Sequence, residues 1–284
     1  MLWEDMREED FKSAAEECGK VCVMPAGCME MHGQHIPVGT DCYQAEYTAR
    51  EAAKIEPVCV FPTFKFGDVQ GLQHYGGAVI LSVELEQMLL TELCENIARN
   101  GFKKIMILNG HGGNTFLLGN FVRSTQHDKK DYVVMKRNDY RYGIRSLAAE
   151  LEAGKEFPEL TPTDVDHVIT FVRSNYLTGH ACIEETSIML AIAPETVHMD
   201  RVNVISGMPT GTTKYLAEAG LTDTTRFWIN EYPNSYSGEK VEWASEGIGR
   251  ALLRRRVDDQ VEACRRLKQD DRILDWNAEW NEKW

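Results

Sequence analysis

The sequence lacks an excess of positive charge and lacks any long apolar run, and these absences exclude several classes of protein. It has 31 Lys and Arg residues against 44 Asp and Glu residues, a formal net charge of -13. Nucleic acids and anionic membrane surfaces attract basic proteins, so neither is an expected partner. No segment approaches the roughly 18 apolar residues of a membrane span. We therefore expect neither a nucleic-acid-binding nor a membrane-spanning protein.

Paired cysteines and a secretion signal are also missing. The first 20 residues are acidic and amphipathic, without the basic start and apolar run of a signal peptide. The eight cysteines are scattered, and none forms a Cys-x-x-Cys pair. Several lie inside apolar segments such as VCVMP, where a free cysteine behaves as a small hydrophobic residue. We predict reduced, buried thiols and a cytoplasmic location.

Segments typical of strands and helices alternate through the first half of the chain. The expected strands are 20–27, 102–110 and 131–137, and 58–67 is expected to begin as a strand and run into a loop. The expected helices are 41–55, 82–101 and 114–128. Ser82 is a candidate N-cap and Gly101 a candidate stop for the second helix. Strands that alternate with helices predict an α/β fold with a mostly parallel central sheet and helices on both faces.

The second half of the chain has fewer sequence patterns that indicate helices or strands. Residues 137–181 are polar and are expected to form irregular connections near a binding cleft. A helix is predicted at 184–194, closed by Pro194, and the Gly-, Thr- and Ser-rich segment 207–240 is predicted to be loop. A long helix follows. We find no internal repeat or low-complexity linker, so we predict one domain over 1–284 with a C-terminal helical extension from about residue 241.

Acidic and imidazole side chains gather where the first expected strand ends. The segment AGCMEMHGQHIPVGTDCYQA (26–45) holds Glu30, His32, His35 and Asp41. On an extended backbone residues i and i+2 point the same way, so Glu30 and His32 present their side chains together. Asp41, at the start of the next helix, can fold back over the same point.

A second polar segment, NGHGGN (109–114), contains His111 and stands at the end of another expected strand. Ligands of open α/β sheets bind at the carboxyl ends of the strands, so both segments are expected to face one cleft. Carboxylate and imidazole together suit Zn²⁺, Mn²⁺ or Fe²⁺, and a two-metal site needs a bridging carboxylate. A lone histidine is more often structural, and NGHGGN alone could be a phosphate-binding turn or a tight connection. The combination favours a metal site.

A third segment, GHACIEETSIML (179–190), adds His180 at a loop end and Glu184 and Glu185 at a helix start. Acidic residues at a helix start stabilise its N-terminus, and one of these two needs no other role.

The segments PAGCMEMHGQHIPVGTD, NGHGGN and GHACIEETS together resemble the signature blocks of the creatininase (creatinine amidohydrolase) family. They occur in the family's order, and the resemblance spans roughly residues 20 to 200. It implies a three-layer α/β fold, a metal-dependent hydrolase with two divalent ions, and an oligomer, since several members are hexamers. The ions implied are Zn²⁺ or Mn²⁺, with Fe²⁺ as a further option.

Residue by residue, the resemblance implies that Glu30 and His111 bind one metal ion, His32 binds the other and Asp41 bridges them. His180 matches the family's catalytic histidine.

Creatininase has a metal-binding Glu two residues after the His of the second block, and Gly113 stands there in this chain. We therefore assign Glu185 as the carboxylate of the second ion, with Glu184 as the alternative. Creatininase also closes tryptophans over creatinine from loops that here contain none, which argues against creatinine as the substrate.

Three functions are compatible with these residues. The first is hydrolysis of an amide (C–N) bond of a small polar metabolite, in a ring or open. The second is ring-opening C–C hydrolysis of a cyclic keto-inositol, for which the loop offers a polar set: Tyr140, Arg141, Tyr142, Arg145, Arg173 and Asn175. The third is a metal-stabilised binding protein without turnover, which needs no free histidine beside the metals.

Three tryptophans near the C-terminus, Trp276, Trp280 and Trp284, recur every four residues and would line one face of a helix. Such a stripe packs either on its own domain or against a neighbouring subunit. With the family resemblance, it leads us to expect a homo-oligomer, a hexamer in particular.

Overall fold

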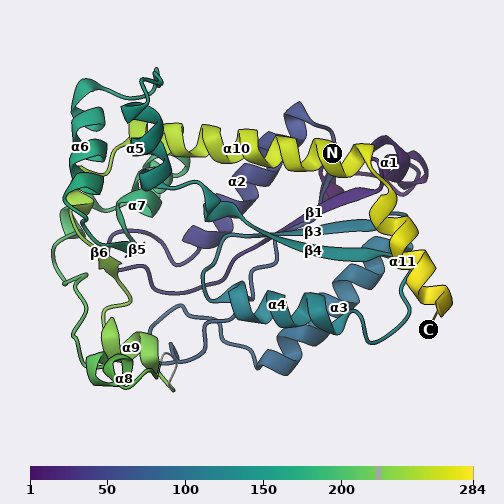
Figure 1. The fold of residues 1–284 in the computed structure, drawn as a ribbon, viewed down its shortest axis with the longest axis horizontal. Coiled ribbons are helices and arrows are strands. Elements are labelled where there is room, and N and C mark those ends of the chain that lie inside the picture. The colour runs from purple at the N-terminus through teal and green to yellow at the C-terminus, as the bar shows by residue number, and fades with distance from the viewer. Residues whose placement is uncertain (222–224, 284) are drawn as a thin grey trace.

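A parallel sheet of four strands lies between two layers of helices in the computed structural model, which describes residues 1–221 and 225–283 (Figure 1). The strand order is β2-β1-β3-β4. The strands are β1 (Val21–Ala26), β2 (Cys59–Val60), β3 (Lys104–Asn109) and β4 (Val133–Asn138). The predicted α/β fold with a parallel central sheet and helices on both faces is confirmed.

The two faces of the sheet are covered by different helices. Helices α2 (Thr40–Ile55) and α10 (Glu246–Gln269) lie on one face, and α3 (Val83–Arg99) and α4 (Asn114–Ser124) on the other (Figure 1). Val21 and Val23 of β1 pack with the α2 and α10 layer, whereas Cys22 and Met24 pack with α3 and α4. Strands of a parallel sheet are buried on both faces, which explains their continuous apolar runs.

Most elements of the first half were predicted at nearly their observed positions. Ser82 caps α3, since its side chain accepts a hydrogen bond from the Leu85 amide, and Gly101 follows the helix with a φ of 95°. The segment 58–67, predicted as a strand that runs into a loop, contributes only Cys59 and Val60 to the ladder. Pro62 has no amide hydrogen to donate to a neighbouring strand, which favours an early end.

The prediction of irregular structure over 137–181 was wrong. Two helices, α5 (Ile144–Glu152) and α6 (Pro162–Arg173), occupy much of this segment. Thr161 and Asp164 form a capping box at the start of α6, and Pro162 takes its first turn. These helices bury a second apolar core with α7 (Ile183–Ile192) and α10.

The segment predicted as loop, 207–240, is largely irregular but includes short elements. These are α8 (Lys214–Glu218), α9 (Phe227–Glu231) and β6 (Ser237–Gly238), which pairs antiparallel with β5 (Thr178–His180). The remaining elements are α1 (Phe11–Glu17) and five 3-10 turns: η1 (Trp3–Asp5), η2 (Asp139–Arg141), η3 (Pro194–Thr196), η4 (Met199–Arg201) and η5 (Val241–Trp243).

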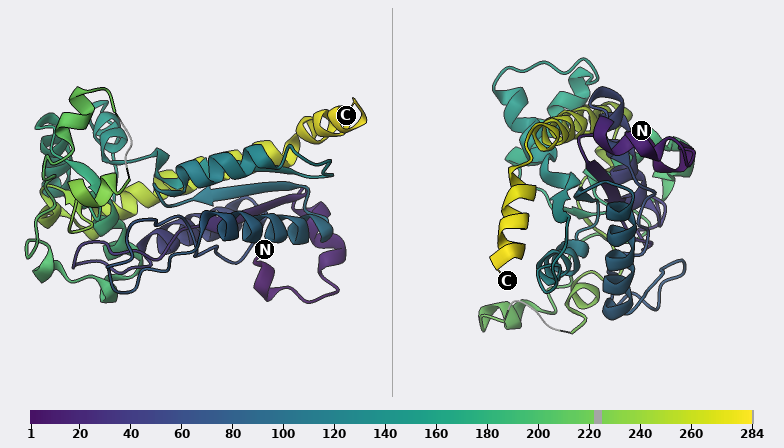
Figure 2. Two further views of the ribbon diagram at one scale, coloured as in Figure 1. Left: turned by 90° about the horizontal axis from the view of Figure 1, so that it is seen from below. Right: turned by 90° about the vertical axis from the view of Figure 1, so that its right-hand side faces the viewer.

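The C-terminal part begins with α10, which packs across α2 and α7. Helix α11 (Arg272–Lys283) then turns away and projects beyond the amino ends of the strands (Figure 2). Trp276 and Trp280 are 54% and 67% exposed, and Trp284 lies outside the described residues. All eight cysteines are buried and unpaired. Among the described residues, no helix has the length and apolar character needed to cross a membrane.

Candidate metal centre

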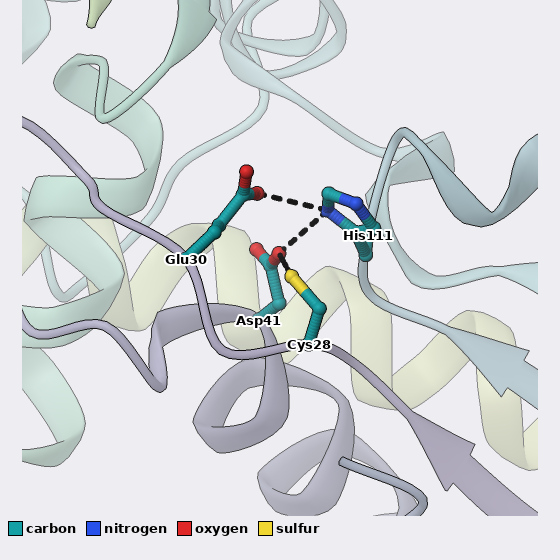
Figure 3. Close-up of side chains that lie close together, drawn as sticks. All are labelled: Cys28, Glu30, Asp41 and His111. Atoms are coloured by element: carbon teal, nitrogen blue, oxygen red, sulfur yellow. Dashed lines mark hydrogen bonds and ion pairs between the residues drawn. The ribbon is translucent and has the colours of Figure 1, made fainter. Parts of the chain in front are cut away.

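The carboxyl ends of β1 and β3 bring the polar segments together around the start of α2. Glu30 and His32 follow β1, His111 follows β3, and Asp41 lies in the first turn of α2. Figure 3 shows Glu30, Asp41 and His111 of this set. The backbone at the end of β3 lies very close to the start of α2. A Cβ atom on Gly110 would lie 2.5 Å from the Asp41 carbonyl oxygen. The glycine at this strand end therefore lets the helix start reach the sheet.

Asp41 presents its two carboxylate oxygens to two different histidines. Its Oδ2 lies 2.8 Å from His111 Nδ1, and its Oδ1 lies 3.3 Å from His32 Nε2. Glu30 Oε1 is 3.0 Å from His111 Nδ1, and Glu185 Oε2 is 3.9 Å from His32 Nε2. Two groups of potential metal ligands thus share Asp41, one with Glu30 and His111 and the other with His32 and Glu185.

Backbone carbonyls fix the orientation of both imidazoles. His111 Nε2 donates to the Asp68 carbonyl at 2.8 Å, and His32 Nδ1 donates to the Glu30 carbonyl at 3.1 Å. In the neutral rings the other nitrogen then carries a lone pair that faces carboxylate oxygens. A lone pair facing a carboxylate requires either a proton or a cation between them, which is how metal-binding histidines are commonly held.

The charges of the cluster are not balanced by permanent cations. Glu30 and Asp41 are 3% and 2% exposed, and no Lys or Arg among the described residues pairs with them or with Glu185. Burial disfavours the charged form of Asp41, but His32 and His111 outweigh it and hold the Asp41 pKa well below its usual range. Burial raises the pKa of Glu185 to about 7. Buried carboxylates without cationic side chains suit divalent ions.

The excess of buried carboxylates also shifts the pKa of His32. Burial alone would lower its pKa, but Asp41 and then Glu185 raise it to about 10. The chain alone therefore balances its carboxylates by keeping protons on its histidines, a role that metal ions take over when they bind. The residues present fit a centre for divalent metal ions.

His180, at the end of β5, lies at the edge of this cluster. Its Nε2 donates to the Met31 carbonyl at 2.8 Å, which leaves Nδ1 facing Glu30 Oε1 at 3.7 Å. Burial lowers its pKa, and the nearby His32 lowers it further. The ring centroids of His180 and His32 are 4.1 Å apart. His180 also forms a third group of potential ligands, with Glu30 and His32, and it is not a member of either group that contains Asp41.

The neighbouring glutamates of α7 have different partners. Glu185 Oε2 accepts a hydrogen bond from the Ala181 amide at 2.6 Å and faces His32. Glu184 accepts from Thr178 and lies 3.7 Å from the guanidinium of Arg256. Only Glu185 belongs to a group of potential metal ligands.

Sequence reasoning did not identify two residues of the site. The sulfur of Cys28 lies 3.2 Å from Asp41 Oδ2, although the sequence suggested only a small hydrophobic residue. The ring centroid of Trp228, from α9, lies 5.5 Å from that of His180. The spacing Cys-x-Glu could have indicated the first, but a tryptophan 48 positions after His180 carries no local signal.

Two further histidines, His35 and His74, lie outside the cluster. His35 contacts the Ala181 carbonyl and the Thr186 hydroxyl, and burial lowers its pKa to about 4, as expected for a neutral structural histidine. His74 is exposed and lies against Tyr75.

A family model described as creatininase, creatinine amidohydrolase, matches residues 4–264. The chain belongs to the creatininase family. Creatinine amidohydrolase of Pseudomonas putida is 22% identical over 202 residues, covering 69% of this chain and 72% of that protein. The mycofactocin precursor peptide peptidase of Mycobacterium ulcerans is 24% identical over 196 residues, covering 66% of this chain and 64% of that protein.

Solved structures of creatininase share the fold. A manganese form superposes with a TM-score of 0.71 at 17% identity, covering 93% of this chain and 97% of that one. A variant of Zn-Zn type has a TM-score of 0.68 at 18% identity, covering 93% and 97%. The predicted creatininase-like fold and family membership are confirmed, and with them the assignment as an enzyme of a metal-dependent hydrolase family.

Proposed function

We propose that this creatininase-family chain hydrolyses an amide (C–N) bond of a small polar metabolite with two divalent ions, Zn²⁺ or Mn²⁺. The observation that carries the proposal is the position of Asp41, whose two oxygens face histidine nitrogens on opposite sides. Glu30, Asp41 and His111 would hold one ion, and His32, Asp41 and Glu185 the other. The manganese and Zn-Zn forms of the related creatininases support this choice of metals.

When bound, two such ions lower the pKa of a water molecule toward neutrality and polarise a carbonyl oxygen. The side chains of this cluster set where that chemistry takes place. Asp41 and Glu30 are almost fully buried, whereas the side chains of Glu185 and His180 are 17% and 12% exposed. Substrate therefore enters from the side of Glu185 and His180.

His180 is the residue that we assign to proton transfer. The Met31 carbonyl occupies its Nε2, so Nδ1 is the atom that takes a proton from the attacking water and delivers it to the leaving nitrogen. Its lowered pKa keeps the ring neutral, and therefore able to accept that proton, near neutral pH. Trp228 lies edge-on to the same imidazole and offers an apolar surface that limits access of bulk water.

The amide-bond class is supported by the names of the relatives, an amidohydrolase and a peptidase. The ring-opening alternative drew on the polar set of residues 140–175, and several of these side chains pair with one another or with neighbours on α5 and α6. Arg145 bonds to Asn175, and Arg173 pairs with Glu152. That set gives the keto-inositol alternative no additional support.

The experiment is a hydrolysis screen of the metal-loaded protein against cyclic amides, formamides and keto-inositols, with His180→Ala as the control. We expect turnover of an amide that the control lacks. Turnover of keto-inositols alone would favour C–C hydrolysis. A third outcome is full metal content without turnover of any substrate class, together with equal ligand binding by the control. That outcome would favour a non-catalytic binding protein.

We further propose that the chain forms a homo-oligomer, a hexamer in particular. Trp276 and Trp280 are exposed on α11 and line a groove of about 670 Å³ beside β4, which is an edge strand. Exposed aromatic side chains beside an open strand edge are typical of subunit contacts. Light scattering at micromolar concentration is expected to give a multimer, and a monomer there would contradict the proposal.

A cytoplasmic location completes the proposal. Eight buried, unpaired thiols suit a reducing compartment. Fractionation of the source cells is the direct measurement.

A further inference from the structure

The thiol of Cys28 lies among the proposed metal ligands, yet the ligand set described above does not use it. Its sulfur is 3.2 Å from Asp41 Oδ2. Potential ligand atoms of Cys28, Glu30, Asp41 and His111 all lie within 4.8 Å of one another, and all four residues are buried. Figure 3 shows these four side chains close together, coming from the loop after β1, the start of α2 and the loop after β3.

The direction of the Cys28 side chain is specific to this thiol. Cys42, which follows Asp41, is also buried, but its sulfur contacts the Cys28 carbonyl oxygen at 3.3 Å and is not part of the group of potential ligands. Two thiols of similar burial thus lie beside the cluster, and one of them is directed into it.

The spacing of the donor atoms matches a small tetrahedral site. With Zn–S of about 2.3 Å and Zn–O of about 2.0–2.2 Å, a sulfur and an oxygen on one tetrahedral zinc ion lie about 3.5 Å apart. The observed separation of 3.2 Å between Cys28 Sγ and Asp41 Oδ2 is close to this value. His111 Nδ1 lies 2.8 Å and 3.0 Å from Asp41 and Glu30, whereas a nitrogen and an oxygen on one tetrahedral zinc ion lie about 3.4 Å apart. These donor atoms would therefore move apart by about half an ångström to admit the ion.

We infer that Cys28 is the fourth ligand of the ion held by Glu30, Asp41 and His111, and that its sulfur makes this position prefer Zn²⁺ to Mn²⁺. The inference rests on the proposed two-metal centre. Thiolate is a soft ligand that favours zinc, whereas manganese prefers carboxylate, carbonyl and water oxygens. When the ion binds, the Cys28 proton now donated to Asp41 leaves to solvent, and the Asp41 oxygen and the sulfur both turn to the metal.

This ligand set makes the two positions unequal. Four protein ligands are typical of a closed zinc site, whereas the position of His32, Asp41 and Glu185 has three and keeps a place for water or substrate. The Cys28 position is therefore expected to bind zinc tightly and selectively. The position of His32, Asp41 and Glu185 is expected to hold the exchangeable ligands, water or substrate.

Cobalt substitution provides a test that does not depend on activity. Co²⁺-loaded wild-type protein is expected to show visible ligand-field bands and a near-ultraviolet sulfur-to-cobalt charge-transfer band. Cys28→Ser should keep the ligand-field bands, lose the charge-transfer band and lower the preference for Zn²⁺ over Mn²⁺ in competition by roughly tenfold or more, since even outer ligand partners change metal affinity 10–100-fold. Cys42→Ser is the matched control and should keep all three features.

The outcomes separate this inference from the proposed function. Ligand-field bands without a charge-transfer band in the wild type would overturn Cys28 ligation and leave the metal centre standing, with the thiol only a hydrogen-bond donor to Asp41. No ligand-field bands at all would overturn the metal centre itself. If Cys28→Ser does not fold, zinc X-ray absorption of the wild type decides, because a sulfur neighbour supports the inference and a shell of nitrogen and oxygen alone contradicts it.

Discussion

Two buried ionic clusters lie on either side of the first turn of α7, and they are balanced in different ways. In one, the Arg256 cluster, the guanidinium lies 3.5 Å from Asp139 and 3.7 Å from Glu184, and it donates to Gln44 at 3.0 Å. In the other, the proposed metal centre, histidines are the only basic side chains among the described residues that pair with the three carboxylates. The adjacent residues Glu184 and Glu185 belong to different clusters.

The difference shows what each cluster requires. A buried charge is tolerated when an opposite charge and hydrogen bonds compensate it. The Arg256 cluster finds an opposite charge and hydrogen-bond partners within the chain, so we expect it to contribute to stability. The proposed metal centre finds them only by holding extra protons or by binding cations, which is why we propose it as a site for metal ions. Predictions that remove one member of each cluster test this distinction.

The largest effect is expected for Asp41→Ala. Because this carboxylate faces both groups of ligands, its loss should reduce metal content from close to two ions per chain to a small fraction and reduce hydrolysis to background. Elemental analysis of the folded variant measures this. Asp139→Asn, a buried Asp of the Arg256 cluster, is the control and should keep its metals. Full metal content in Asp41→Ala would show that Asp41 is not a bridge.

His180→Ala should keep both metals yet lose about 10²- to 10⁴-fold in turnover, the usual range for general acid–base catalysis. Metal analysis and kcat on one preparation give both quantities. Loss of metal in this variant would instead make His180 a ligand and remove the proton carrier from the mechanism.

Arg256→Ala should lower the free energy of unfolding by about 3–5 kcal/mol, because it leaves Asp139 buried without its cation. Urea titration of the metal-loaded protein measures this. Arg250→Ala, on the same helix, removes an exposed pair with Glu246 and should cost less than about 1 kcal/mol. Equal costs for the two variants would mean that the Arg256 cluster adds little stability.

The pair Glu185→Gln and Glu184→Gln compares the clusters within one helical turn. Glu185→Gln should weaken metal binding on the order of 10–100-fold, since a neutral amide replaces an anionic ligand. Glu184→Gln should leave metal affinity unchanged and cost about 1.5–3 kcal/mol of stability, the usual worth of a hydrogen bond to a charged group. The reverse pattern in a metal titration would exchange the two assignments.

The smallest effect is expected for Asp164, a carboxylate that is stabilised by hydrogen bonds from neutral groups. Asp164 accepts hydrogen bonds from the Thr161 amide at 2.8 Å and the Ser245 hydroxyl at 2.6 Å, and these outweigh burial and lower its pKa below 3.8. Because the pKa of Asp164 is lower in the folded state than in the unfolded state, the ionised carboxylate stabilises the fold above about pH 4. This contribution is lost as the pH falls through the pKa of the folded state. Asp164→Asn should therefore lose roughly 1 kcal/mol at pH 7 and show a flatter acid limb of stability.

The sequence predicted those features that local patterns encode. The apolar runs of β1 and β3, the Ser82 cap and the polar residues at strand ends each depend on neighbours close in the chain. The two helices within 137–181 also had local signals, because Thr161, Pro162 and Asp164 form a recognisable helix start. The polar composition of the segment obscures these signals.

Contacts between distant segments could not be predicted. The pairing of Glu184 with Arg256 joins residues 72 positions apart, and it distinguishes the two glutamates that the sequence left as alternatives. Trp228 reaches His180 through a loop without a regular pattern. The position of the family's second-block Glu is Gly113 here, and a Cβ atom there would collide with His111 Nε2 and the Asp68 carbonyl. A side chain at this position would therefore require His111 and the Asp68 backbone to shift.

The central claim is that the cluster around Asp41 holds two metal ions within one chain. Anomalous X-ray diffraction from crystals of the Zn²⁺- and Mn²⁺-loaded protein, measured at both metal absorption edges, tests it most directly. The account predicts two peaks on opposite sides of the Asp41 carboxylate, with the zinc signal on the side of Cys28 and His111. A single peak, or metal bound away from Asp41, would contradict it.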